Sequence, residues 1–133
     1  MAKIIHTSGT RKRARARATI REGKGIVKIN GKMLDVFEPE MARMKIREPL
    51  LLVKDVSGKV DIDVNVHGGG VISGADAARL AVGRALADYT GKAGVKETLS
   101  GYDRKLLVPD VRHKEPCKPN VSKPRKKRQK SYR

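Results

Sequence analysis

Hydrophobic and polar residues alternate in two stretches of the chain. In "KVDIDVNVH" every second position from Val60 to Val66 is β-branched and the positions between are polar, which predicts a strand with one buried face. In "TRKRARARATIR" the odd positions from Arg11 to Arg21 carry arginine or threonine, whereas the even ones are mostly Ala or Ile. A helix is also compatible with Arg and Ala but would scatter the arginines, so the alternation favours a strand with one cationic face.

Gly and Pro residues, which mark turns and helix ends, together with helical spacing, predict the other elements. A Gly-rich turn at Glu22–Gly25 leads into a second strand, and "NGK" marks another turn. Between Pro39 and Pro49, "EPEMARMKIR" predicts a helix with Pro39 in its first turn and Pro49 at its end. A shorter helix is expected over Lys96–Lys105.

The stretch "GGGVISGADAARLAVGRALADYTG" predicts the main helix. Ser73 and Asp76 have the spacing of a capping box at its start. Its small residues would let it lie close on a sheet, and the whole pattern predicts an α+β body. One helical face would carry Ala78, Val82, Ala85, Leu86 and Tyr89.

Charge divides the chain into a body and two cationic arms. The 133 residues include 31 basic and 14 acidic ones, a net charge of +17. Residues 1–21 hold seven basic residues and no acidic one, and residues 112–133 hold ten basic and one acidic residue. Prolines after Val108 exclude a long helix. We therefore expect a globular body over residues 1–111, with a basic first strand, and an extended cationic tail over residues 112–133 whose partner is a polyanion.

Composition narrows the classes of function. Four aromatic residues and no Trp argue against base stacking as the main recognition device and favour phosphate contact. A single cysteine, Cys117, allows no internal disulfide, and no apolar run approaches the ~20 residues of a membrane span. His113 and Cys117 alone do not make a metal site, and no nucleophile is paired with a base. We expect a soluble, non-enzymatic protein of a reducing compartment, with no metal, no cofactor and no membrane partner.

Two segments of the body are candidate nucleic-acid sites. On one strand, alternate side chains stand ~7 Å apart, close to the phosphate spacing of a nucleic-acid strand, so Arg11, Arg13, Arg15 and Arg17, with Lys12 beside them, would follow one backbone. The alternative is a solvated charged face. The loop Gly68-Gly69-Gly70 before the main helix fits an RNA phosphate, a nucleotide phosphate, or only a turn that needs positive φ. It lacks the Gly-Lys-Ser/Thr ending of a P-loop.

The tail is not a pure run of charge. Gln129, Ser131 and Tyr132 add hydrogen-bonding groups and one ring to it, which a mere solubilising arm would not need. We expect its basic residues to bind RNA: Lys123, Arg125, Lys126, Lys127 and Arg128.

Several motifs, in order along the whole chain, resemble one protein family. "SGTRKRARARATIREGKG", "VHGGGVISGADAARLAVGRAL", "LSGYDRKLL" and the ending "RQKSYR" are similar to the ninth-protein family of the small ribosomal subunit. The ending resembles the archaeal and eukaryotic branch, because Tyr132 stands where the bacterial pattern has Lys.

The resemblance implies a structural component of the head of the cytoplasmic small ribosomal subunit. Its fold would be a mostly antiparallel four-stranded sheet with helices on one face and a left-handed βαβ crossover. Its partners would be small-subunit ribosomal RNA, neighbouring head proteins and peptidyl-site tRNA. The tRNA contact would come from the last residues of the tail: Lys130, Ser131, Tyr132 and Arg133.

Two alternative functions remain open from the sequence. One is a DNA-binding architectural protein, since the cationic arms would suit any nucleic acid. The other is a small phosphotransferase, because the same fold family includes kinases that hold phosphates with a Gly/Ser-rich loop before a helix.

Overall fold

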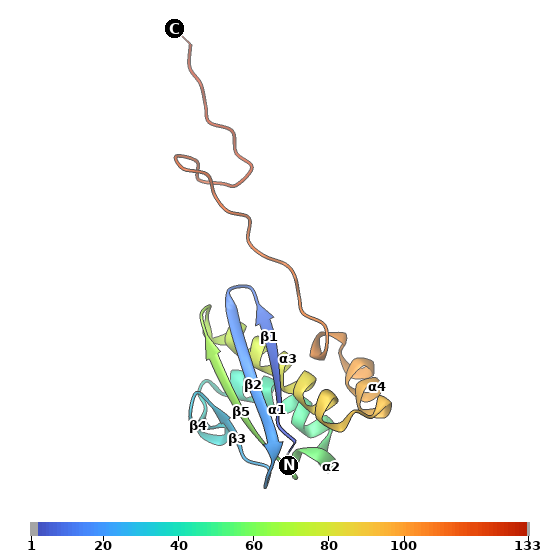
Figure 1. Cartoon of the computed structure of the whole chain (residues 1–133). Coiled ribbons are helices and arrows are strands. Elements are labelled where there is room, and N and C mark those ends of the chain that lie inside the picture. Colours follow the sequence, from blue (N-terminus) through green and yellow to red (C-terminus); the bar gives the residue numbers. More distant parts are fainter. Residues whose placement is uncertain (1–2, 133) are drawn as a thin grey trace.

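A β-hairpin begins the body of the protein. The computed structural model describes residues 3–132, and Figure 1 shows a body of strands and helices with a long tail. β1 (Ile5–Arg11) pairs antiparallel with β2 (Ala14–Glu22), and Lys12–Arg13 form the connecting turn. The prediction of one uninterrupted strand from Arg11 to Arg21 is therefore wrong at its start. The reversal is possible because Lys12 adopts a left-handed φ of 52°, a conformation that its residue type does not signal.

The sheet has five strands, one more than predicted. The order is β1-β2-β5-β3-β4, with β5 (Val60–His67) parallel to β3 (Val27–Ile29) and every other pair antiparallel. The shortest strand, β4 (Lys32–Met33), is only two residues long. It follows the predicted turn, where Asn30 and Gly31 have φ of 50° and 79° and form the two-residue loop of a hairpin.

A crossover of helices joins the parallel strands. It contains the short 3₁₀ segment η1 (Leu34–Val36), α1 (Glu40–Leu52) and α2 (Lys54–Ser57). The prediction that Pro49 ends the helix is wrong, because Pro49 lies inside the last turn of α1 and is fully buried. Burial of its ring offsets the backbone hydrogen bond that proline cannot donate.

The main helix, α3 (Val71–Thr90), starts earlier than the predicted capping box allows. Its N-cap is Gly70, so Ser73 already lies in the first turn and caps nothing. Asp76 instead forms an ion pair with Lys45 of α1 at 2.7 Å. The predicted short helix is present as α4 (Ala93–Tyr102), followed by the 3₁₀ turn η2 (Arg104–Leu106).

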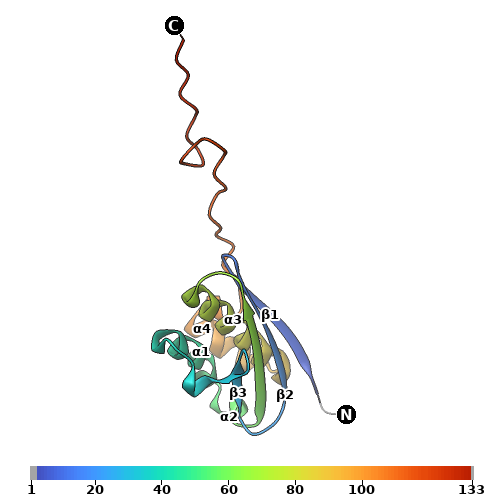
Figure 2. The same cartoon turned by 90° about the vertical axis from the view of Figure 1, so that its left-hand side faces the viewer.

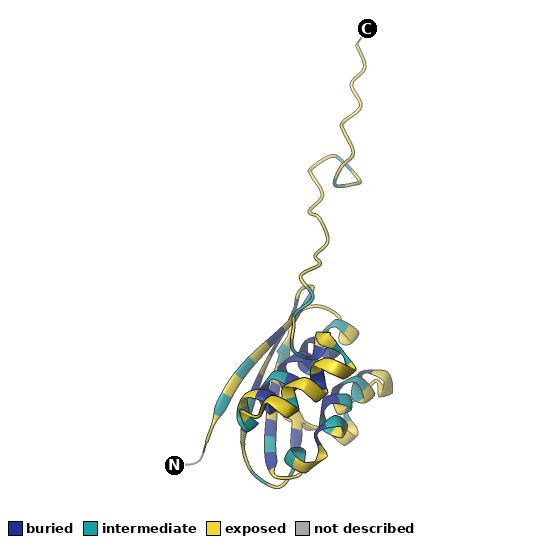
Figure 3. Cartoon of the chain, turned by 90° about the vertical axis from the view of Figure 1, so that its right-hand side faces the viewer, coloured by how far each residue is buried: buried dark blue, intermediate teal, exposed yellow. Residues whose placement is uncertain are grey.

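The core lies between α3 and one face of the sheet. Figure 2 shows the helices on that face, and Figure 3 shows buried residues, in dark blue, on both the strands and the helices. A Cβ atom on Gly9 of β1 would lie 2.2 Å from the carbonyl oxygen of Ala77, so helix and sheet approach as closely as the small residues predicted. The alternation of β2 and β5 is confirmed by their fully buried residues: Ala14, Ala16, Ala18, Ile20, Val60, Ile62 and Val64.

The chain leaves the body at the hairpin end of the sheet. Asp110 makes an isolated parallel β-bridge with Arg11, and from Val111 to Tyr132 the chain contains neither helix nor strand. This segment extends far from the body (Figure 1). Among the described residues, no helix combines the length and apolarity that crossing a bilayer requires.

Candidate nucleic-acid interface

The face of the sheet opposite α3 carries unpaired arginines. Arg15 and Arg17 are exposed on β2, between alanines that are buried on the other face. Neither has an acidic cross-strand neighbour, and no carboxylate of the described chain forms an ion pair with either. Their neighbours on β1 and β5 are Ser8, Thr10, Asn65 and His67.

The opposite end of the same face is balanced by acidic residues. Arg21 lies across from Asp61 of β5, and Thr19 across from Asp63. Asp61 accepts backbone hydrogen bonds from Ile26 at 3.0 Å and from Lys24 at 2.9 Å, and these bonds lower the pKa of its carboxyl group. Asp61 therefore holds the predicted Gly-rich turn in place, and the free positive charge lies toward the hairpin turn.

Arg11 does not share the environment of the other arginines. It lies in β1, its guanidinium is 2.6 Å from Asp110, and it approaches Asp76 at 4.0 Å. Arg112 donates hydrogen bonds to the same Asp110, and with Arg11 it holds the pKa of that carboxyl far below its usual range. Arg11 is thus held by the body and fixes the point where the tail begins.

The glycine loop packs directly on the hairpin turn. Gly68 and Gly69 have φ of 74° and 67°, so the predicted need for positive φ is confirmed. A Cβ atom on Gly69 would lie 2.8 Å from the backbone nitrogen of Ala14, and one on Gly68 would lie 2.8 Å from the carbonyl oxygen of Arg13. We call β2, which carries Arg15 and Arg17, the arginine strand. The glycine loop and this strand, predicted as separate sites, therefore meet at one corner of the molecule.

The start of the tail completes this corner. A pocket there is lined by residues from the hairpin turn, the glycine loop, the first turn of α3 and the tail: Arg11, Lys12, Arg13, Gly69, Gly70, Ser73, Arg112, His113 and Lys114. We call the exposed basic residues Lys12, Arg13, Arg112 and Lys114 the cationic corner. The sequence did not point to Arg112 and Lys114 as members, because only the Asp110 anchor places the tail beside the loop.

The predicted tail residues are exposed. From Lys123 to Ser131, all basic side chains point into solvent, and Tyr132 is 87% exposed. Arg125 pairs with Glu115, the one acidic residue of residues 112–133, at 2.7 Å. Arg133, for which a tRNA contact is predicted, lies outside the described residues. Among residues 3–132, no three His, Cys, Asp or Glu side chains group as metal ligands.

Known proteins resemble the chain over almost its full length. The family model described as "Ribosomal protein S9/S16" matches residues 9–133. The protein named "Small ribosomal subunit protein uS9" of Methanococcus vannielii is 50% identical over 133 residues, which cover 98% of this chain and 99% of that protein. The protein of the same name from Methanococcus maripaludis is 48% identical over the same shares. These archaeal relatives agree with the branch that the ending resembles, and the chain belongs to the ribosomal protein S9/S16 family.

Proposed function

We propose that this protein is a structural component of the small ribosomal subunit in the cytoplasmic ribosome, where it binds ribosomal RNA and is not an enzyme. Its family membership supports this role. The observation that carries the RNA-binding mode is the convergence of the arginine strand, the glycine loop and the tail at the cationic corner. Of the four cations there, Arg112 is paired with Asp110, whereas Lys12, Arg13 and Lys114 form no ion pair within residues 3–132 and are available to RNA phosphates.

Ribosomal RNA would contact the body through two kinds of group. Lys12, Arg13, Arg15 and Arg17 supply exposed positive charge along the hairpin and its turn. The backbone of Gly68–Gly70, at the uncapped N-terminus of α3, supplies N–H groups and the positive end of the helix dipole. Arg11, which Asp110 engages, would act by positioning the tail.

The tail would fold on RNA and reach a second site. Extended at about 3.3 Å per residue, residues 112–133 span about 70 Å, so an anchored body can act at a distance. Phosphates along the path would neutralise the basic run from Lys123 to Arg128, and a partner would supply the order that this segment cannot generate alone. The end of the tail would contact the anticodon stem-loop of peptidyl-site tRNA: Lys130, Ser131, Tyr132 and Arg133.

The family resemblance supports two finer statements. The protein would lie in the head of the subunit among neighbouring head proteins. The crossover from β3 through α1 to β5 would have the left-handed connection of this family.

Co-sedimentation tests the proposal against its alternatives. Small subunits reconstituted without this protein should bind the purified chain stoichiometrically in moderate salt, and the chain should remain bound through a sucrose gradient. Duplex DNA of equal charge at the same salt is the control. Preference for the DNA would favour an architectural DNA-binding protein and contradict the ribosomal role.

Thermal unfolding with ATP tests the phosphotransferase alternative. A ligand at 100 times its dissociation constant stabilises a fold by ~2.7 kcal/mol, so a true nucleotide site would raise the melting temperature clearly. We expect no ATP-specific rise beyond that produced by inorganic triphosphate at the same ionic strength.

A further inference from the structure

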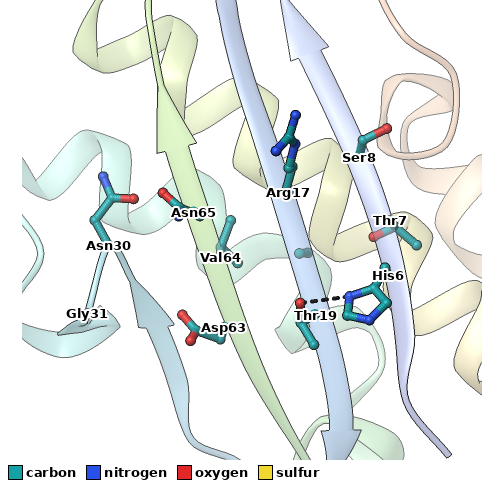
Figure 4. Close-up of a pocket in the computed structure, with 11 residues that line it drawn as sticks. His6, Thr7, Ser8, Arg17, Thr19, Asn30, Gly31, Asp63, Val64 and Asn65 are labelled. Atoms are coloured by element: carbon teal, nitrogen blue, oxygen red, sulfur yellow. Dashed lines mark hydrogen bonds between the residues drawn. The ribbon is translucent and has the colours of Figure 1, made fainter.

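A shallow hollow of about 820 Å³ lies on the open face of the sheet, between β1 and the Asn30–Gly31 turn (Figure 4). Its size falls in the range of sites that hold one small ligand. Strand register fixes its floor as two adjacent rows across β1, β2 and β5. One row contains His6, Thr19 and Asp63, and the next contains Ser8, Arg17 and Asn65.

Arg17 and Asp63, the charged side chains that line this hollow, do not form an ion pair with each other. Arg17 lies directly across from Asn65, which places Asp63 two residues away on the diagonal, a separation of about 7–8 Å between Cα atoms. Lys28 of β3 is in register with Asp63, yet no ion pair or hydrogen bond of the Asp63 carboxylate is found within residues 3–132. By contrast, His6 and Thr19 are hydrogen-bonded to each other at 3.0 Å. A free acceptor and a free cation therefore face the same space.

A free carboxylate is out of place on a surface that only follows phosphates, because it repels them. It suits a nucleobase, because a carboxylate accepts hydrogen bonds from the N–H groups of the base. The Watson–Crick edge of guanine presents two neighbouring donors, N1–H and the N2 amino group, to the two oxygens of one carboxylate. Uracil presents a single N–H donor between two carbonyl oxygens. These oxygens repel a carboxylate that approaches the N–H.

We propose that the hollow binds one unpaired guanosine of RNA, with Asp63 accepting from its Watson–Crick edge and Arg17 contacting its phosphate. Only an unpaired nucleotide has that edge free. The Asn65 side chain, between these two residues in the rows, can donate to the guanine O6. This inference rests on the RNA binding proposed above and adds a base preference to it.

Binding of short RNAs by the full chain tests this site. Three heptamers of identical charge are compared by fluorescence anisotropy at one moderate salt concentration: UUUUUUU, UUUGUUU, and the same sequence with inosine, which lacks the N2 amino group, at the centre. The variants are Asp63→Asn and, as a control with the same chemical change at an exposed position of α3, Asp88→Asn. Circular dichroism confirms that each variant is folded.

We expect the parent to bind UUUGUUU at least about fivefold more tightly than UUUUUUU, the lower end for a bidentate base contact. Inosine should fall between them. Asp63→Asn should bring the ratio close to one while leaving affinity for UUUUUUU equal or higher, since a negative charge has been removed. Asp88→Asn should keep the parental ratio.

Three results would overturn the site: a parental ratio near one, a preserved ratio in Asp63→Asn, or an equal loss in Asp88→Asn. If the parent still binds RNA in a salt-dependent way, any of these results rejects the guanosine site and leaves the proposed RNA-binding function standing. Absence of RNA binding by the parent would reject the proposed function as well.

Discussion

Gly9 sets the distance between the sheet and α3. A Cβ atom there would lie 2.2 Å from the carbonyl oxygen of Ala77 and 2.8 Å from the nitrogen of Ala81, both backbone atoms. Backbone cannot move aside as a flexible side chain can, so helix and strand would have to separate. The fit of the core therefore depends on the absence of one methyl group.

Replacing Gly9 with Ala should lower the free energy of unfolding by about 1–3 kcal/mol, the usual cost of overpacking. Gly94→Ala is the matched control, because a Cβ atom on Gly94 in α4 meets nothing within 4 Å. The control should be neutral or stabilising by up to about 1 kcal/mol, since Ala is the better helix former. Urea denaturation measures both, and equal stabilities of the two variants would contradict the close approach.

Asp61 should make the free energy of unfolding depend on pH in the acidic range. The backbone hydrogen bonds from Ile26 and Lys24 lower its pKa in the folded state, so its carboxylate stabilises the fold above its ordinary pKa of ~3.9. That contribution is lost as the pH falls through the lowered folded-state pKa. Asp61→Asn should therefore be less stable than the parent at pH 6, and the gap should close toward pH 2. Urea denaturation across this range measures the gap, and a gap that stays constant with pH would mean that the charge of Asp61 does not support the turn.

At the scale of elements, the period of the hydrophobic pattern predicted the strand whose buried face sets that pattern. It missed the β1–β2 turn, which depends on one backbone torsion. The alternation of Val60–Val66 placed β5 correctly, since a buried face must repeat every second residue. The split of the arginine run into β1 and β2 depends on the positive φ of Lys12, which carries no Gly, Asn or Asp signal. Pro49 was misleading for the opposite reason, because its local preference yields to burial in the core.

The candidate site was predictable in its parts but not in its assembly. The exposed Arg15 and Arg17 follow directly from the alternation of β2. Arg11 seemed equivalent to them in the sequence, but it lies on β1 before the hairpin turn and forms a tertiary contact with Asp110. The meeting of glycine loop, hairpin turn and tail depends on strand order, which no local pattern of this sequence encodes.

The arginine strand should determine the salt dependence of RNA binding. Each neutralised phosphate contributes about 0.7–0.9 to the log–log slope of affinity against salt, so replacing Arg15 and Arg17 with Gln should flatten the slope by about 1.4–1.8. In the control, Arg43 and Arg47 are replaced with Gln; both contact Asp35 beside α1. Filter binding to small-subunit ribosomal RNA measures the slopes. Equal slopes for the two double variants would show that the arginines on β2 are merely solvated.

At the scale of the whole molecule, the body and tail should differ in order. Amides of Val60–Val66 and Ala78–Tyr89 lie in β5 and α3 and should be protected from hydrogen exchange. Residues 112–132 have few backbone hydrogen bonds and should exchange at nearly free rates without RNA, then slow when ribosomal RNA is added. Strong protection of the tail in the free protein would contradict folding on binding.

In the proposed function, the tail would let a protein that is anchored at one place act at another. The ion pair between Arg11 and Asp110 holds the start of the tail, and the exposed residues near its end are too far from the body to stabilise it. Their contribution should therefore appear in tRNA binding and not in the folding of the body.

The most direct test of this account is peptidyl-site tRNA binding to reconstituted small subunits, measured by filter binding. The test variant lacks residues 130–133, and the control replaces Lys126 and Lys127 with Gln, so that each variant loses two basic residues. Both should assemble into subunits. One charge-assisted contact contributes about 1.5–3 kcal/mol, so truncation should weaken tRNA binding by about ten- to a hundredfold, while the control should retain most of it. Parental tRNA affinity in truncated subunits would contradict the account and reduce the tail to an anchor in ribosomal RNA.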